Sequence, residues 1–147
     1  MASRIPVIRN TNYFYLIPQV AILLIIIYIF YMAGIEHYML LGVSLYFLLS
    51  IYLKVLIPKW HRKGIYLLKK GKLDLAILSF QRSYDFFRRN AWIDQYRAFV
   101  LFSTSRYSYA EMALMNIIYC FEQLGDTKMA RKYHKILQEQ FPENRYS

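Results

Sequence analysis

Two long runs of apolar residues come early in the chain, and the rest alternates apolar and polar positions at helical spacing. The apolar runs cover residues 13–33 and 38–57 and are separated by the short stretch 34–37. A helix of about 20 residues is long enough to cross the hydrocarbon layer of a bilayer, which is about 30 Å thick. Two buried helices of a soluble core would also be apolar, but the rest of the chain is too short to enclose them. We therefore predict an N-terminal part, 1–58, with two transmembrane helices.

The basic residues around the two runs predict their orientation. Arg4 and Arg9 precede the first run, whereas the connecting stretch offers only Glu36 and His37. Six basic residues end or follow the second run: Lys54, Lys59, Arg62, Lys63, Lys69 and Lys70. Because cytoplasmic loops are enriched in Lys and Arg, both termini are predicted to be cytoplasmic. We expect an integral protein with two spans, in a bacterial inner membrane.

Beyond Pro58 the apolar residues follow the period of amphipathic helices, and no segment alternates like a strand. Glycines and capping residues divide this part into five helices. The predicted helices are 59–70, ended by Gly71; 72–89; 91–104, capped by Asn90; 108–124, opened by a capping box and ended by Gly125; and 127–140, capped by Asp126. Short connections make neighbouring helices antiparallel. The predicted fold class is all-α, a two-helix transmembrane hairpin followed by a cytoplasmic domain, 59–147.

An offset of 34 residues superposes similar residues of this domain. It aligns Gly64 with Ala98, Leu67 with Leu101, Ala76 with Ala110, Phe80 with Leu114, and Ser83 with Ile117. Small residues suit positions where two helices cross closely, and larger apolar residues fill the grooves between helix pairs. A fixed period of this length is typical of a helical solenoid.

These residues resemble the tetratricopeptide repeat (TPR) family. The resemblance rests on Trp60-x3-Gly64-x2-Leu67, followed by Gly71, Ala76 and Phe80, whereas Lys63, Ser83 and Arg88 depart from the family pattern. It implies a five-helix TPR-like antiparallel α-solenoid, with repeats at about 57–90 and 91–124 and a capping helix at 127–140. The helix 108–124 can equally be counted as the opening helix of a last repeat, 111–144.

In the TPR family the concave groove typically holds an extended peptide or a partner helix. By analogy, six side chains would line such a groove here: Lys63, Tyr66, Lys70, Gln95, Arg97 and Ser105. Their basic character suits an acidic peptide or a C-terminal carboxylate, although ordinary solvated charges would give the same pattern. Four residues at the end of the second run and just beyond it are expected at the membrane interface: Lys54, Lys59, Trp60 and Arg62.

The net charge of +10 is carried mostly by the part after the apolar runs. A basic domain tied to a bilayer faces the anionic lipids of the inner leaflet, and this attraction accounts for the charge. Nucleic-acid binding is disfavoured, because the basic residues are spread over every helix and do not form one stripe.

The sequence contains no constellation typical of a catalytic, cofactor or metal site. His37, His61 and His134 are scattered, and we expect His61 to be solvated at the membrane boundary. The lone Cys120 cannot form an internal disulfide, so we expect a small core residue in a reducing cytosol. The helix 108–124 is apolar nearly all round, which predicts either the most buried helix of the domain or a docking face.

Together these features predict a membrane-anchored protein-interaction scaffold that is not an enzyme and binds no cofactor. Its partners would be the lipid bilayer and proteins, either an acidic peptide or another membrane protein. The alternative is a structural accessory subunit of a larger membrane complex, serving transport, secretion or envelope assembly. Self-association also remains open, because pairing two hairpins would bury more surface than one hairpin does.

Overall fold

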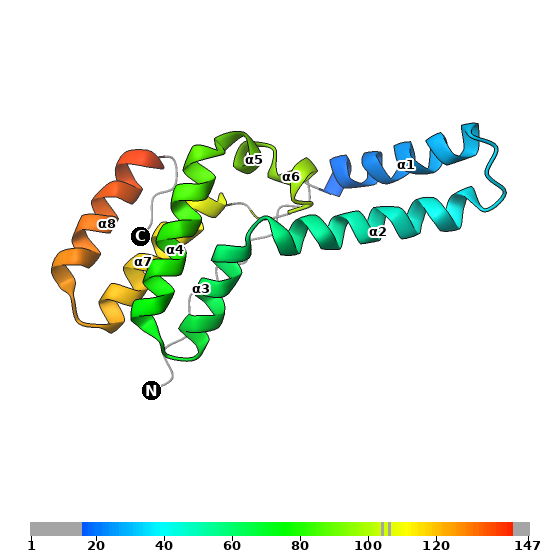
Figure 1. The fold of residues 1–147 in the computed structure, drawn as a ribbon. Coiled ribbons are helices and arrows are strands. Elements are labelled where there is room, and N and C mark those ends of the chain that lie inside the picture. The colour runs from blue at the N-terminus through cyan, green and yellow to red at the C-terminus, as the bar shows by residue number, and fades with distance from the viewer. Residues whose placement is uncertain (1–15, 104, 106, 143–147) are drawn as a thin grey trace. The chain divides into compact units, whose positions relative to one another are not determined.

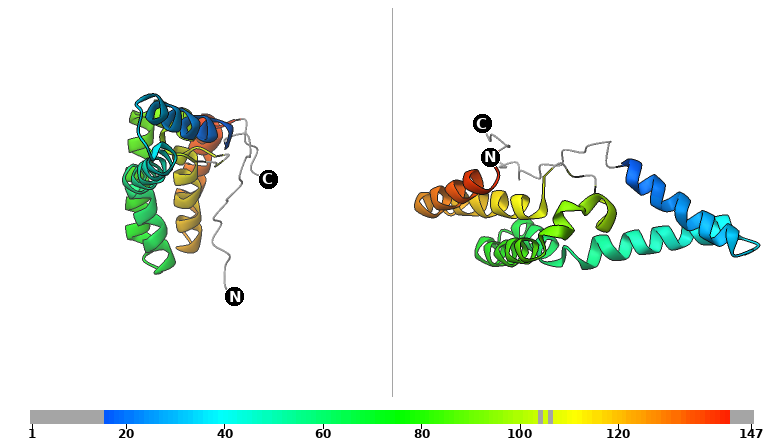
Figure 2. Two further views of the ribbon diagram at one scale, coloured as in Figure 1. Left: turned by 90° about the vertical axis from the view of Figure 1, so that its right-hand side faces the viewer. Right: turned by 90° about the horizontal axis from the view of Figure 1, so that it is seen from above.

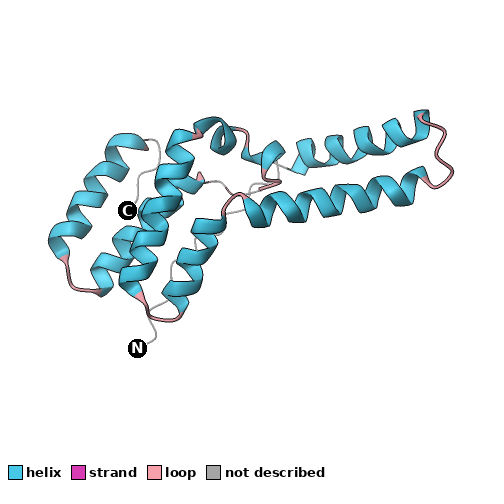
Figure 3. Cartoon of the chain, in the orientation of Figure 1, coloured by secondary structure: helices cyan, strands magenta, loops and turns pink. Residues whose placement is uncertain are grey.

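The computed structural model describes residues 16–103, 105 and 107–142, which form helices joined by loops (Figure 1, Figure 3). The helices of these residues are α1 (Leu16–Met32), α2 (Tyr38–Leu56), α3 (Lys59–Lys69), α4 (Leu73–Arg89), α5 (Ala91–Gln95), α6 (Arg97–Val100), α7 (Tyr109–Gln123) and α8 (Thr127–Gln140). No strand occurs in this part of the chain, and the all-α class is confirmed.

The described residues divide into two compact units. The four-helix unit comprises residues 58–94 and 107–142, with α3, α4, α7 and α8. The apolar unit comprises residues 16–57 and the described residues of 95–105, with α1, α2 and α6. The short helix α5 lies at the boundary between the two ranges.

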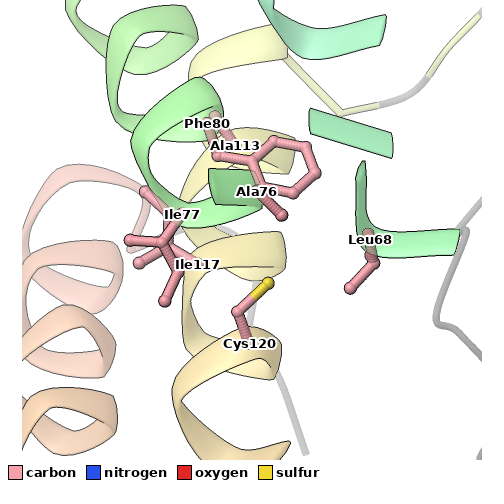
Figure 4. Close-up of a cluster of buried hydrophobic side chains, with 7 residues drawn as sticks. All are labelled: Leu68, Ala76, Ile77, Phe80, Ala113, Ile117 and Cys120. Atoms are coloured by element: carbon pink, nitrogen blue, oxygen red, sulfur yellow. The ribbon is translucent and has the colours of Figure 1, made fainter. Parts of the chain in front are cut away.

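In the four-helix unit, α4 packs against both α3 and α7, and α8 packs against α7 (Figure 2). Figure 4 shows the side chains of the main core cluster, which come from α3, α4 and α7: Leu68, Ala76, Ile77, Phe80, Ala113, Ile117 and Cys120. A second cluster joins Leu114 and Ile118 of α7 to Leu137 of α8. The predicted buried face of the helix 72–89 is confirmed at Ala76, Ile77 and Phe80.

Gly64 permits the close approach of α3 to α4. A Cβ atom at this position would lie 2.6 Å from Cε1 of Phe80, well inside van der Waals contact. The Phe80 ring, with none of its surface exposed, therefore occupies the space that a side chain at position 64 would need. This packing is the physical reason for a small residue at this point of α3.

The predicted helix ends of the four-helix unit are confirmed to within one or two residues. Gly71 and Gly125 take positive φ angles of 71° and 75° directly after α3 and α7, as helix-ending glycines do. At the start of α7 the Ser108 Oγ accepts from the Glu111 N–H at 3.1 Å, and the Glu111 Oε2 accepts from the Ser108 N–H at 3.2 Å. Asp126 caps α8 by accepting from the Met129 N–H at 3.0 Å.

The prediction of one continuous helix over 91–104 is wrong. The structure has two short helices here, α5 and α6, separated by Tyr96. The side chain of Asn90 bonds to the preceding helix: its Nδ2 donates to the Phe86 carbonyl oxygen at the end of α4, at 2.9 Å. No bond in which its Oδ1 caps the following helix is recorded among the described residues, so the start signal on which the prediction depended is not seen.

The helix α7 is the most buried helix of the four-helix unit, as its composition predicts. Eight of its fifteen residues are buried, more than on any other helix of the unit. Its large apolar side chains are all buried or half-buried. The burial of this helix favours its interpretation as a core element, and a docking role stays untested.

In the apolar unit, α1 and α2 pack side by side and are connected by residues 33–37. They approach closely at Gly42, where a Cβ atom would lie 2.9 Å from Cγ1 of Ile27. Among the described residues α2 alone is long and apolar enough to cross a membrane, judged by length and composition. The helix α1 has 17 residues, and positions 13–15 of the predicted first span lie outside the described residues.

The pattern of burial in α1 and α2 is the reverse of that in the four-helix unit. The only buried residue of α1 is Gln19, and those of α2 are Gly42 and Ser50. Large apolar side chains point outward along both helices, among them Ile17, Leu24, Ile29, Leu40, Phe47 and Leu48. The buried residues of α1 and α2 are therefore polar or small, and the large apolar residues of these two helices lie mostly at the surface.

Candidate functional site

The first helix of the four-helix unit presents a basic face. Burial of His61, Gly64 and Leu68 fixes the inward face of α3, because these residues recur at helical spacing. The opposite side of the helix is exposed and carries Lys59, Arg62, Lys63, Tyr66, Lys69 and Lys70. The amphipathic sequence of α3 thus concentrates five cations on one surface of a single short helix.

Three cations surround the ring of Trp60. The Nζ atoms of Lys59 and Lys63 lie 5.6 and 5.5 Å from the ring centroid, and Cζ of Arg82, on α4, lies 4.8 Å from it. One turn further along, the Lys70 Nζ lies 4.5 Å from the Tyr66 ring centroid. Each such contact stabilises by about 0.5–1 kcal/mol at an exposed site. We call Lys59, Trp60, Lys63 and Arg82 the Trp60 cluster.

The positive charge of the Trp60 cluster is not matched by an ion pair within the described residues. The ion pairs recorded there join His134 to Glu122 at 3.7 Å and Lys135 to Glu139 at 3.8 Å, on α7 and α8. The aromatic ring instead holds the cations at its faces and leaves their remaining N–H donors free for solvent or an anion. The cluster is therefore suited to bind carboxylate or phosphate groups.

Sequence reasoning missed Arg82. The amphipathic pattern of α4 places this residue on an exposed face, but only the packing of α4 against α3 brings its guanidinium to Trp60. The helical periodicity of α3 and α4 could have predicted that Trp60 and Arg82 lie on outward faces. It could not have predicted that the two side chains contact each other.

The six predicted groove residues lie in two different units. Lys63, Tyr66 and Lys70 share the exposed side of α3. Gln95, Arg97 and Ser105 belong to the apolar unit, where the Arg97 Nε donates to the Ser105 carbonyl oxygen at 3.1 Å. A single groove built from all six residues stays a prediction.

The four residues predicted at the membrane interface lie at the junction of α2 and α3. Lys54 is in the last turn of α2 and is exposed. Lys59 and Arg62 are exposed on the first turn of α3, and Trp60 is half-buried beside them. Their depth relative to a membrane stays a prediction.

The expectation that His61 is solvated is wrong. Only 8% of its surface is exposed, and its ring lies edge-on to Phe80 and Tyr109, at centroid distances of 5.5 and 5.4 Å. Burial lowers the pKa of His61 to about 4, so the imidazole is neutral at physiological pH. The periodicity of α3 carried this information, since His61 lies three residues before Gly64 on the same face.

A buried carboxylate at the start of α7 was also missed. The two carboxylate oxygens of Asp94 accept from the backbone N–H groups of Tyr109 and Ala110, at 2.8 and 2.9 Å. Negative charge at a helix N-terminus is favourable, because the unpaired N–H groups there carry partial positive charge. Asp94 therefore serves as a structural cap, fifteen residues away from the helix that it stabilises.

Two further features of the described residues are the buried thiol of Cys120 and a depression beside the start of α2. Cys120 is fully buried, and burial raises the pKa of its thiol to about 11, which leaves little thiolate at neutral pH. A shallow depression at the turn between α1 and α2 is lined by Glu36, His37, Tyr38, Met39, Leu40 and Val43. No group of three or more His, Cys, Asp or Glu residues suited to a metal ion occurs within 16–103, 105 and 107–142.

Comparison of the chain with protein-family models, with curated proteins and with solved structures found no match. The resemblance to the TPR family is therefore carried by the sequence pattern alone. The function has to be inferred from the two units and from the Trp60 cluster.

Proposed function

We propose that the protein is a membrane-anchored protein-interaction scaffold. In this proposal α1 and α2 form a two-span hairpin in a bacterial inner membrane, with both termini in the cytoplasm. The four-helix unit is a short TPR-like array, and the Trp60 cluster on its surface binds acidic segments of partner proteins. The inverted burial of α1 and α2 is the observation that carries the proposal.

A hairpin in water would hide its apolar side chains, whereas α1 and α2 hide Gln19, Gly42 and Ser50. In a bilayer apolar side chains gain nothing by facing the neighbouring helix, because lipid tails are equally apolar. Small residues then promote close helix contact, as Gly42 does against Ile27, and polar residues turn away from lipid. The burial pattern of the pair is therefore the one that a lipid environment favours.

The order of helix contacts supports the TPR-like interpretation of the four-helix unit. The pair α3 and α4 is followed by the pair α7 and α8, and α7 packs on α4 while it also touches α3. Successive helix pairs of a solenoid stack in this way. On this basis the second repeat is 109–140, close to the count that starts a last repeat at 111. Residues 95–105 are then an insertion between the two repeats.

Labelling of single cysteines tests the membrane arrangement. A cysteine at Glu36, in the turn between the two helices, should react with a membrane-impermeant maleimide in intact cells, and one at Ser147 should react only after lysis. Cys120 should stay unlabelled because it is fully buried. Reaction at Ser147 in intact cells would contradict the proposed orientation.

Charge reversal tests the binding function. We would compare the unaltered protein with the double variant Lys63→Glu/Arg82→Glu, using a fluorescent hexaglutamate peptide as the probe. The matched control is Lys128→Glu/Lys132→Glu, which makes the same change in net charge at exposed positions of α8. We expect the cluster variant to lose at least about tenfold in affinity, or about 1.4 kcal/mol, and the control to lose much less. Equal losses would mean that only the net charge matters.

The same variants distinguish the scaffold from an accessory subunit. A fixed subunit of a membrane complex would co-purify with its partner from native membranes in constant proportion, whichever pair of charges is reversed. A scaffold that recognises acidic segments would lose its partners only when the Trp60 cluster is changed.

A further inference from the structure

Residues 95–105 are part of the apolar unit, although the chain on both sides of them is part of the four-helix unit. The helix α6, in the middle of this insertion, packs against α1. The inner side of the insertion is formed by Ala98, Leu101 and Phe102, each at most 5% exposed. The insertion is therefore packed into the apolar unit through buried side chains.

The ring of Phe102 anchors the insertion to α2. It lies edge-on to the ring of Tyr46, with centroids 5.2 Å apart and planes at 86°. Phe102 has a φ of 49°, which no other residue except glycine approaches in the described chain. A bulky residue keeps such a conformation only where its surroundings hold it in place. The contact with Tyr46 supplies that constraint.

The position of Tyr46 sets the depth that the insertion reaches. Tyr46 lies ten residues before Leu56, the last residue of α2. At 1.5 Å per residue this distance is about 15 Å, or half the thickness of the hydrocarbon layer. With α2 across the bilayer, a segment that touches Tyr46 has passed the headgroups. Since no second apolar run separates the insertion from α2, it enters from the leaflet at which α2 ends.

The insertion has two further properties that membrane depth requires. Part of its backbone is paired within the segment: the N–H groups of Val100, Leu101 and Ser103 donate to carbonyl oxygens of Tyr96 and Arg97, at 2.9–3.1 Å. Each such bond lowers the cost of placing polar backbone groups near lipid. The second property is the aromatic character of its outer surface.

Aromatic side chains form the outer surface of the insertion. Tyr96 is 52% exposed and Phe99 is 51% exposed, on the same segment whose inner side contacts α1 and α2. Tyrosine favours the headgroup region and phenylalanine the acyl chains. The exposed surface thus continues the apolar surface of α1 and α2.

We infer that residues 96–102 form a short re-entrant element that contacts the lipids of the cytoplasmic leaflet through Tyr96 and Phe99. The inference rests on the proposed membrane attachment of α1 and α2. The chain then meets the bilayer three times: at the two spans and at an insertion between the two repeats.

Electron paramagnetic resonance of spin-labelled cysteines tests this inference on the full chain in vesicles of phosphatidylethanolamine and phosphatidylglycerol. The test position is Phe99→Cys, with Tyr96→Cys as a second position if the first variant misfolds. Leu48→Cys, on the outer surface of α2, is the reference for lipid, and Leu78→Cys, on an exposed face of α4, is the reference for water. The measured quantity is the ratio of collision rates with oxygen and with a water-soluble nickel chelate.

We expect the ratio at position 99 to exceed the ratio at position 78 several-fold and to approach that at position 48. Water-like values at positions 96 and 99, with a lipid-like value at 48, would overturn the re-entrant element and leave the membrane attachment standing. Water-like values at 48 and 99 together would overturn both.

Discussion

Phe80 and Leu48 are both large apolar side chains near the middle of a helix, yet the structure treats them in opposite ways. Phe80 is fully buried between α3, α4 and α7, whereas Leu48 on α2 is 68% exposed. The same contrast separates the four-helix unit from the helices α1 and α2. The four-helix unit has a core of apolar residues, whereas the buried residues of α1 and α2 are Gln19, Gly42 and Ser50.

In the proposed membrane arrangement, the contrast between the four-helix unit and the helices α1 and α2 reflects two different solvents, water and lipid. In water the burial of apolar surface is worth about 25 cal/mol per Å², which is why the core of the four-helix unit is apolar. In lipid this force is absent, and close packing and polar contacts select what lies inside. One chain therefore follows two opposite rules of burial, and mutations can test each rule separately.

The largest effect is expected at the core of the four-helix unit. Replacing Phe80 by alanine should reduce the free energy of unfolding by about 3–5 kcal/mol, because the ring fills the space beside Gly64. Urea unfolding in detergent, followed by tryptophan fluorescence, measures this loss, since Trp60 and Trp92 both belong to this unit. A loss below about 1 kcal/mol would mean that the ring is not in the core.

A matched pair of charge insertions should separate the two solvents. In the proposed membrane arrangement, Leu48→Arg puts a charge at mid-span and should lower membrane insertion by about 3 kcal/mol, whereas Leu78→Arg on α4 should change stability by about 0.5 kcal/mol or less. The fraction of each variant that resists alkaline extraction from membranes reports the difference. Full retention of Leu48→Arg would contradict a lipid-facing α2.

Acid should weaken the four-helix unit through His61. The folded state holds this imidazole neutral with a pKa of about 4, below the ordinary value of 6.5. Because the unfolded chain binds the proton more readily, the stabilisation is complete above pH 6.5 and is lost as the pH falls toward 4. The loss from this group amounts to at most about 3 kcal/mol.

The control for this prediction is His61→Phe, which keeps an aromatic ring beside Phe80 and Tyr109 without a titrating group. The difference in unfolding free energy between the two proteins should be constant above pH 7 and should change steadily below 6.5. A difference that does not vary with pH would show that His61 is accessible to water in the folded state.

The smallest effect is expected at Ser83, whose hydroxyl oxygen is buried without a hydrogen-bond partner in the described chain. Ser83→Ala removes this unpaired group and should raise the unfolding free energy by about 1 kcal/mol. Ser79→Ala is the matched control, because the Ser79 Oγ donates to the Leu75 carbonyl oxygen at 2.9 Å. A loss of stability in Ser83→Ala would indicate a water-filled site beside the hydroxyl.

Features that depend on neighbouring residues in sequence were predicted well. The capping box of Ser108 and Glu111, the cap at Asp126 and the helix-ending Gly71 and Gly125 are confirmed, because each acts within one turn of its own helix. The core position of Phe80 is confirmed for a similar reason, since helical periodicity alone assigns the faces of α4.

Features that depend on packing between helices were predicted poorly. Asn90 was predicted to cap the segment 91–104, but its side chain bonds back to α4, and Asp94, which was not singled out, caps α7. The same limit applies to Arg82, whose partner Trp60 lies on another helix. Such pairings depend on distances through space that the order of residues does not contain.

The sequence by itself determined the all-helical class, the two apolar runs and the ends of the helices in the four-helix unit, since these follow from local propensity, capping and period. Only the tertiary structure decided that Arg82 lies beside Trp60, that Asp94 caps α7, and that α6 packs on α1 while Phe102 contacts Tyr46 of α2. The physical reason is that burial and side-chain pairing are properties of surfaces brought together by folding. The sequence around a polar residue near a helix end can be the same whether the folded side chain contacts water, an aromatic ring or a backbone N–H group.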